Sequence, residues 1–236
     1  MGNYETIEDG ALFISDAHYP NHGTELLELL YQIDSKKIRA VQLFLMGDIF
    51  DLLIGSFEKS YAPNKEAIEL IKSIAQHTPI YYFEGNHDFQ LSKIFTNIKI
   101  FRREDQPQYM GMNGFIIGLS HGDRYAVGWK HSLMSKVLRN SLVLSVIKIL
   151  RPNIVAEKTA GLKEKEICHE ISNFDSKAKE IFDNYAGAFW VIEGHYHQAR
   201  KIHNYISLPS LACHKQVAVV KDSLIEFVDI EDLLLS

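Results

Sequence analysis

Five short groups of histidine, aspartate and asparagine recur along this chain of 236 residues, and each group directly follows an apolar run. Imidazole, carboxylate and amide oxygen without thiolate suit borderline or harder divalent ions, so Mn²⁺, Fe and Zn²⁺ fit better than Cu(I). Two such ions about 3.5 to 4 Å apart produce a nucleophile at neutral pH and offset charge on phosphoryl oxygens. The residue types therefore indicate metal-assisted hydrolysis of a phosphate ester. In chain order the groups are Asp16-Ala17-His18, Gly47-Asp48-Ile49-Phe50-Asp51, Gly85-Asn86-His87-Asp88, His121-Gly122-Asp123 and Gly194-His195-Tyr196-His197.

Each group taken alone also has an ordinary structural explanation. Aspartate after glycine is common in turns, and a chain with 11 histidines forms pairs such as Asp16 and His18 by accident. These explanations do not supply all five groups in order, each after an apolar run, and this order favours a site. The histidines outside the groups are interpreted as surface or packing residues, although the first is close enough to His18 in sequence to line a site: His22, His77, His131, His169, His203 and His214.

The elements that must position these groups alternate between strands and helices. Apolar periodicity predicts strands at 11–15, 40–46 and 79–83, with helices at 24–33 and 65–76 between them. Further strands are predicted at 114–120 and 189–192 and near the C-terminus, and a long helical pattern covers 132–150. This alternation is typical of an α/β fold. In open α/β sheets ligands bind beyond the carboxyl ends of the strands, so the five groups are expected to converge there.

The five groups match the motifs DxH, GDxxD, GNHD, H and GHxH, and on these motifs the chain resembles the calcineurin-like metallophosphoesterases over residues 16–197. The resemblance implies a four-layer α/β/β/α sandwich that holds two divalent metal ions bridged by one carboxylate. Residues 1–236 are then expected to form a single metallophosphoesterase domain, with a helical insertion at about 124–186.

The resemblance also implies a role for each motif residue. His87 would protonate the leaving oxygen, and Asp88 would orient His87. Mn²⁺ is the first choice of metal, with Fe or Zn²⁺ as alternatives. The implied ligands are Asp16, His18, Asp48 and His197 for one ion, and Asp48, Asn86, His121 and His195 for the other.

The stretch from Arg124 to Arg151 is basic and apolar within a chain whose net charge is -5. It contains six lysine or arginine residues, no acidic residue, and many apolar side chains between them. Such a stretch is typical of a helix at an anionic membrane surface or against an amphiphilic anionic ligand. A buried helix whose lysine stems extend to solvent explains the same pattern.

With such an insertion, the chain resembles the UDP-2,3-diacylglucosamine hydrolases of lipid A synthesis within this family. The resemblance implies cleavage of UDP-2,3-diacylglucosamine to UMP and 2,3-diacylglucosamine 1-phosphate, with the insertion as a lid that holds the acyl chains. Members of the best-known branch carry arginine at the position of His87 and glutamate at that of Asp51, so this chain follows the general phosphoesterase pattern there. Arg124, Lys130 and Arg139 are candidates for phosphate or sugar contacts from their charge alone.

Two other functions stay open: a soluble nucleotide phosphodiesterase or pyrophosphatase, and a catalytically inactive interaction module on the same fold. An intact ligand set argues against the inactive module. The acidic net charge, together with one apolar-rich basic helix, argues against a nucleic-acid partner.

The two cysteines, Cys168 and Cys213, lie far apart and form no CxxC pattern, so neither a disulfide framework nor a thiolate zinc site is expected. The first residues lack a secretory signal, and no run of 18 apolar residues occurs. A reducing, cytoplasmic location is therefore expected, with peripheral attachment to the inner membrane face as an alternative.

Overall fold

Strand β1 (Leu12–Ile14) shows how alternating side chains build the layers of this fold. Leu12 and Ile14 share a core cluster with helix α1 (Glu25–Asp34), whereas Phe13 belongs to a second cluster on the opposite face of the sheet. Successive side chains of a strand point to opposite faces, so a strand buried on both faces is apolar throughout. The computed structural model describes residues 4–126, 139, 141–151, 153–164 and 166–235.

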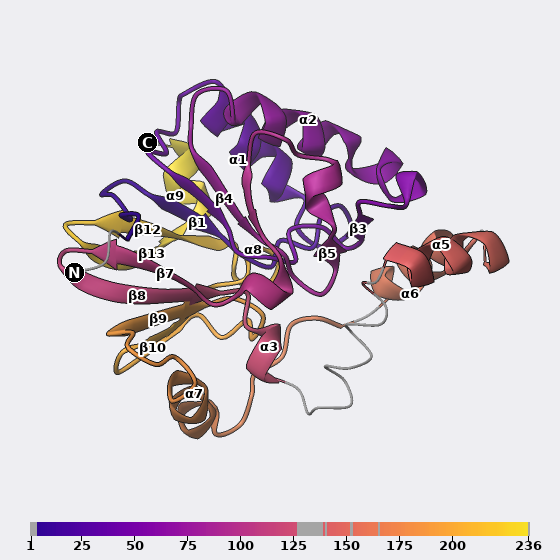
Figure 1. Ribbon diagram of the computed structural model, residues 1–236. Coiled ribbons are helices and arrows are strands. Elements are labelled where there is room, and N and C mark those ends of the chain that lie inside the picture. The colour runs from indigo at the N-terminus through magenta and orange to yellow at the C-terminus, as the bar shows by residue number, and fades with distance from the viewer. Residues whose placement is uncertain (1–3, 127–138, 140, 152, 165, 236) are drawn as a thin grey trace.

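Two sheets lie face to face, and helices cover the outer side of each (Figure 1). The first sheet has the strand order β13-β12-β1-β2-β4-β6, and the second has the order β10-β11-β9-β8-β7. Strands β1, β2, β4 and β6 run parallel in the first sheet, as do β8, β9 and β11 in the second. The other strands are β2 (Leu43–Leu45), β3 (Leu53–Ile54), β4 (Ile80–Phe83), β5 (Asp88–Phe89), β6 (Lys99–Phe101), β7 (Gln108–Met112), β8 (Phe115–Ser120), β9 (Trp190–Glu193), β10 (Arg200–Ile202), β11 (Tyr205–Ser207), β12 (Gln216–Lys221) and β13 (Leu224–Asp229).

Three apolar clusters fill the spaces between the layers. Helices α1 and α2 (Lys65–Ile74) pack on the outer face of the first sheet. Between the two sheets, the ring of Phe44 stacks on Phe13 and on Tyr81, with centroids 4.4 and 4.7 Å apart. Helix α7 (Phe174–Phe182) packs on the outer face of the second sheet through Phe174 and Ile181. The predicted α/β/β/α sandwich is therefore confirmed.

The remaining helices surround this sandwich, and α8 (Leu211–His214) and α9 (Ile230–Leu235) join the cluster on the outer face of its first sheet through Leu211 and Ile230. Helices α5 (Ser141–Leu150) and α6 (Ile154–Lys163) contact the sandwich through a small cluster in which Leu144 and Val155 meet Ile54, Phe57 and Phe89. In the part of the chain that the structure describes, no helix is long and apolar enough to cross a membrane. The helices other than α1, α2 and α7 are α3 (Asp123–Ala126), α5 (Ser141–Leu150), α6 (Ile154–Lys163), α8 (Leu211–His214) and α9 (Ile230–Leu235). Short 3-10 turns occur at Glu58–Ser60, Ala62–Asn64, Leu91–Lys93 and Arg103–Asp105.

The strands and helices predicted around the five groups are confirmed, with small shifts at their ends. The helical pattern predicted at 132–150 is seen as α5 from Ser141, and residues 132–138 and 140 lie outside the described residues. Strands β3, β5, β6, β7 and β10 were not predicted. Residues 99 and 100 in the edge strand β6 are exposed or half-buried, so this strand lacks a continuous apolar run.

Candidate active site

The loops after β1, β2, β4, β8 and β9 meet at the carboxyl ends of these strands, which belong to the two facing sheets. They bring the ring centroid of His18 to 5.0 Å from that of His87 and 5.4 Å from that of His197. The ring centroids of His121 and His195 lie 5.1 Å apart. The structure therefore brings together residues from all five sequence groups.

Potential metal ligands form three overlapping sets at this place. In each set, one atom from every residue lies within 4.8 Å of the others. Asp48 belongs to two sets and links the His18 side of the site to the His121 side, as expected of a carboxylate shared by two ions. The sets are Asp16, His18 and His197; His18, Asp48 and His87; and Asp48, His121 and His195.

The backbone at the site adopts a conformation that most residues avoid. Five of the predicted ligands have positive φ angles, between 47° and 64°. Aspartate and histidine tolerate this left-handed region better than most residues other than glycine, and such angles cluster at functional sites. The sharp turns at the strand ends thereby aim neighbouring side chains into one small volume. The five residues are Asp16, His18, Asp48, His195 and His197.

Two glycines allow the loops to approach one another. A Cβ atom on Gly47, whose φ is +87°, would lie 2.4 Å from Nδ1 of His121. A Cβ atom on Gly85 would lie 2.2 Å from Oδ1 of Asp48. Both contacts are far inside van der Waals distance, so larger residues would displace predicted ligands.

Main-chain carbonyl groups orient three of the histidine rings through Nδ1. A carbonyl oxygen only accepts hydrogen bonds, so Nδ1 carries the proton in each of these rings. Nε2 is then the atom that binds an ion or exchanges a proton. The pairs are His121 with Met46 at 2.8 Å, His197 with Ile167 at 3.0 Å, and His87 with Asp51 at 2.8 Å.

Buried nitrogen atoms without a hydrogen-bond partner lie at the centre of the site. Within the described part of the chain, both ring nitrogens of His18 and Nε2 of His121 lack such a partner. Burial lowers the pKa of His18 to about 4, and burial beside His121 lowers the pKa of His195 to about 4. The neutral imidazoles of His18 and His195 therefore offer unshared electron pairs beside carboxylates, which fits divalent metal ions.

Asp16 and Asp48 supply the negative charge. Burial alone would raise the pKa of both, but His197 lowers the pKa of Asp16 to about 2. His121 and His87 likewise lower the pKa of Asp48 well below its usual value, despite its burial. Oδ1 of Asp48 accepts a hydrogen bond from the His87 N–H at 2.8 Å, and Oδ2 lies 3.5 Å from Nε2 of His121. Both carboxylates are ionised at neutral pH and suit metal coordination.

The Asp88 carboxylate is bonded to the main chain around the site. It accepts hydrogen bonds from the N–H groups of Asp48, Ile49 and Gly85 and from the Tyr82 hydroxyl, at 2.7 to 3.1 Å. The His87 ring donates its hydrogen bond to the Asp51 carbonyl instead. If Asp88 orients His87, as the resemblance implies, it does so through the main chain that its carboxylate holds.

The Asp51 carboxylate secures the loop after β1. It accepts hydrogen bonds from the main-chain and side-chain N–H groups of Asn21, at 2.9 and 2.6 Å. Nδ1 of His22 lies 3.1 Å from its other oxygen. His22 therefore supports Asp51.

A cavity of about 300 Å³ opens at these residues. Asp16 and His121 do not line it and are fully buried. Part of its lining, here called the outer wall, comes from Glu166, Ile167, His169, Ile171 and Lys177. No motif marks the outer wall, and His169 had been interpreted as a surface or packing residue. The predicted residues that line the cavity are His18, Asp48, Asn86, His87, His195 and His197.

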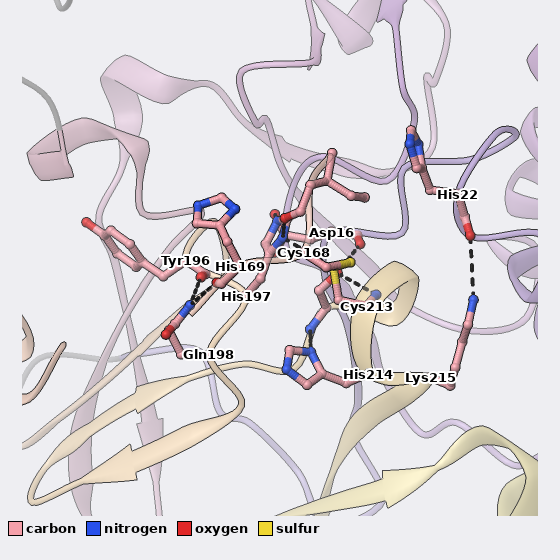
Figure 2. The surroundings of a disulfide bond; sticks show 12 residues. Asp16, His22, Cys168, His169, Tyr196, His197, Gln198, Cys213, His214 and Lys215 are labelled. Carbon is pink, nitrogen blue, oxygen red and sulfur yellow. Dashed lines mark hydrogen bonds and ion pairs between the residues drawn. A yellow bond between two sulfur atoms is a disulfide. The ribbon is translucent and has the colours of Figure 1, made fainter. Parts of the chain in front are cut away.

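Cys168 and Cys213 form a disulfide beside the outer wall, which corrects the expectation of unpaired cysteines (Figure 2). Their Cα atoms lie 5.5 Å apart although 45 residues separate them in sequence. Sγ of Cys213 lies 3.6 Å from Nδ1 of His197. The disulfide thus ties the outer wall to α8, and cysteine usage no longer supports a reducing compartment.

The side chain of Gln198 also holds the outer wall. Its carbonyl oxygen accepts a hydrogen bond from the Ile171 N–H at 3.0 Å. Its amide donates a hydrogen bond to the His169 carbonyl at 3.1 Å (Figure 2). The residue directly after the last predicted ligand therefore contacts the segment that faces the cavity.

Two of the three predicted substrate contacts, Arg124 and Arg139, do not line this cavity. Arg139 donates a hydrogen bond to the Gly85 carbonyl at 2.5 Å and covers the Phe89 ring at 5.0 Å, so it supports the loop after β4. Arg124 donates to the Glu104 carbonyl at 3.2 Å. Neither arginine lines the cavity, and Lys130 lies outside the described residues.

The chain has recognisable relatives among known proteins. The family model for calcineurin-like phosphoesterases matches residues 11–199. A UDP-2,3-diacylglucosamine hydrolase of Shewanella baltica is 23% identical over 201 residues, which cover 85% of this chain and 82% of that protein. One of Psychromonas ingrahamii is 23% identical over 224 residues, with 94% and 88% covered. Among solved structures, the E. coli phosphoesterase Yfce is 14% identical, with a TM-score of 0.46 and 94% of each chain covered.

The family match contains all five groups of predicted metal ligands and extends over most of the chain. The structure brings those groups together as three sets of ligand atoms. The chain therefore belongs to the calcineurin-like phosphoesterase family, and it is a dinuclear-metal hydrolase.

Proposed function

We propose that this enzyme cleaves UDP-2,3-diacylglucosamine to UMP and 2,3-diacylglucosamine 1-phosphate, a step of lipid A synthesis. Curated relatives that carry the name UDP-2,3-diacylglucosamine hydrolase cover most of the chain. The structural observation that carries the proposal is an exposed apolar face on a helix beside a phosphoesterase site.

That face belongs to α5 in the predicted lid. Leu144 on one side of the helix is 5% exposed and packs against Ile54, Phe57 and Phe89 of the body. Positions 142, 146, 149 and 150 follow helical spacing and form an apolar stripe. Such a stripe is what acyl chains or a lipid surface would cover. Its residues are Leu142, Val146, Ile149 and Leu150, each more than half exposed.

A second apolar feature lies next to this helix. A cavity of about 530 Å³ is lined by Pro63, Val155 and Ala160, together with Asn153, Thr159 and the ammonium-bearing Lys59 and Lys163. Apolar walls with ammonium groups suit an acyl chain attached to an anionic head group. This cavity supports an amphiphilic substrate over a small soluble one.

In the proposed reaction, the ligand residues orient the scissile phosphate at the end of the cavity. Two divalent ions, with Mn²⁺ as the first choice and Fe or Zn²⁺ as alternatives, would supply a nucleophile at neutral pH and offset phosphoryl charge. Asp16, His18, Asp48 and His197 would hold one ion, and Asp48, Asn86, His121 and His195 the other. The single-domain arrangement with a lid at about 124–186 is part of this proposal.

His87 would protonate the leaving oxygen. Its Nδ1 is bonded to the Asp51 carbonyl and its side chain lines the cavity, so Nε2 is the atom that would deliver the proton. The N–H group of His87 is bonded to Asp48, which couples its position to the predicted bridging carboxylate. General acid catalysis of this kind contributes about 10²- to 10⁴-fold to the rate.

The test compares UDP-2,3-diacylglucosamine, UDP-N-acetylglucosamine and bis-p-nitrophenyl phosphate, each with added Mn²⁺ and after chelation. Faster release of UMP from the acylated compound, abolished by chelation, supports the proposal. Similar slow rates on all three compounds would be consistent with a phosphoesterase but would refute the lipid substrate.

The second candidate is a soluble nucleotide phosphodiesterase or pyrophosphatase. It is favoured by His87 and Asp51, which follow the general phosphoesterase pattern and not that of the best-known lipid branch. Similar rates on acylated and unacylated UDP-sugars, both above the rate on the small diester, would support it.

The proposed location is cytoplasmic, with the α5 stripe in contact with the inner membrane face. Co-sedimentation with anionic phospholipid vesicles tests the contact. Loss of co-sedimentation on polar substitution of the stripe would support it, and equal sedimentation without vesicles would refute it.

A further inference from the structure

Lys177 on α7 is the only lysine or arginine among the described residues that line the active-site cavity. Its ammonium group lies 4.5 Å from the centroid of the Tyr196 ring. Tyr196 stands between the predicted ligands His195 and His197, so this positive charge is held next to the metal-ligating loop.

The structure fixes the position of Lys177 from both sides. Helix α7 is anchored in the core through Phe174, Ala178 and Ile181. Tyr196 is 4% exposed and its hydroxyl donates to the Gly122 carbonyl at 3.3 Å. A cation over an aromatic face is stabilised by the ring while its outer side stays open to a ligand.

None of the residues that the structure describes neutralises the charge of Lys177. No carboxylate of the described residues lies within ion-pair distance of it, and the exposed Glu166 on the same outer wall does not pair with it. Arg139, by contrast, is bonded to Gly85 and lies 3.7 Å from Glu84. The cavity therefore keeps one cation for an anionic group of a ligand.

We propose that Lys177 binds the second phosphate of a diphosphodiester substrate, while the scissile phosphate lies at the predicted metal ligands. Each phosphate of such a substrate carries a negative charge, and the two are joined by one bridging oxygen. A group bound at the ligands thus leaves its neighbour near Tyr196, where an ammonium group can pair with it. This inference rests on the proposed pyrophosphate-cleaving function but not on the acyl chains.

The experiment measures calorimetric dissociation constants for UDP and UMP with the Mn²⁺-loaded protein. The wild type is compared with Lys177→Met, which keeps the aliphatic stem over Tyr196, and with Lys177→Arg, which keeps the charge. Lys179→Met is the matched control, because Lys179 lies on the same helix but lines a different hollow with Phe182 and His203.

We expect Lys177→Met to reduce the preference for UDP over UMP by about tenfold, the effect of one charged hydrogen bond. Lys177→Arg should restore most of the preference, and Lys179→Met should leave it unchanged. Equal weakening of UDP and UMP by Lys177→Met, or no change in either, would overturn the proposal.

The readout separates this inference from the proposed substrate. In one outcome, acylated UDP-sugar is not cleaved preferentially while Lys177→Met still removes the preference for UDP. That result would support the phosphate subsite and refute the lipid substrate. If acylated substrate is preferred but the ratio of the UDP and UMP dissociation constants does not change in Lys177→Met, only the subsite assignment is refuted.

Discussion

Nδ1 of His197 lies 3.0 Å from the carbonyl oxygen of Ile167, which joins the last predicted metal ligand to the outer wall of the cavity. On its other side, Nε2 of His197 lies 3.1 Å from Oδ1 of Asp16. A histidine held in this way presents one nitrogen to a metal site and uses the other to fix its own orientation. The wall that faces the substrate and the ligand that faces the metal are therefore parts of one hydrogen-bonded unit.

Replacing Asp48 by Ala should abolish hydrolysis and reduce metal content at both positions. Asp48 belongs to ligand sets on both sides of the site, so its loss removes a ligand from each. Metal content by atomic emission and turnover of bis-p-nitrophenyl phosphate are the measurements. Two metal ions retained per chain would contradict the shared-ligand assignment.

Replacing His87 by Ala should lower kcat on UDP-2,3-diacylglucosamine by about 10²- to 10⁴-fold. The metal content should stay at the wild-type level. The reason is that His87 would act on the leaving oxygen. The drop should be smaller on bis-p-nitrophenyl phosphate, whose nitrophenolate leaves without a proton. Loss of metal in this variant would instead make His87 a ligand, consistent with its place beside His18 and Asp48.

Replacing Cys168 by Ser should lower the free energy of unfolding by about 4 kcal/mol, the entropic value for a loop of 45 residues. It should also raise KM, because the outer wall loses its covalent link to α8. Urea denaturation with and without a phosphine reductant measures the change in stability, and steady-state kinetics on bis-p-nitrophenyl phosphate measure KM. The stability of the variant itself should not respond to the reductant. Two titratable thiols in the unreduced wild type would show that the disulfide is absent.

Replacing Glu193 by Gln should change how stability depends on pH. Burial raises the pKa of Glu193 from 4.5 to about 7, although it accepts hydrogen bonds from the hydroxyls of Tyr185 and Tyr205. Between pH 4.5 and about 7 the folded state keeps a proton on Glu193 that the unfolded state releases. The stabilisation from this bound proton is therefore lost as pH rises through 7. Relative to the variant, the wild type should lose about 2 kcal/mol between pH 5 and pH 8. Urea unfolding at several pH values measures this difference, and a difference that stays constant would refute it.

Replacing Val146 and Ile149 by Gln should reduce kcat/KM on acylated UDP-glucosamine by about tenfold or more, with a much smaller loss on bis-p-nitrophenyl phosphate. The estimate assumes that each side chain buries apolar surface against the acyl chains, at about 25 cal/mol per Å². Both side chains are more than half exposed, so stability should change little. The matched control is Leu224→Gln, an exposed leucine on β13 outside the lid. Equal losses on both substrates would mean that α5 is only structural.

The sequence determined the chemistry of this protein because that chemistry demands particular residue types at particular places. Metal ligands such as Asp48 and His195 follow apolar runs, since loops at the ends of buried strands position them. The same runs specify the layers, because Phe13, Leu12 and their neighbours must be buried on both faces of a sheet. Local pattern was therefore enough to predict an α/β fold, and the motifs carried the family resemblance that implied the sandwich.

Tertiary structure decided which residues complete the cavity. Cys168 meets Cys213, and Lys177 meets Tyr196, only because α7 and the outer wall pack against the second sheet and α8. Arg139 carried the same charge signal as a substrate contact but packs under the loop after β4. Such contacts join segments that are distant in sequence and carry no periodic pattern, so their partners are set by the packing of whole layers and not by local residue order.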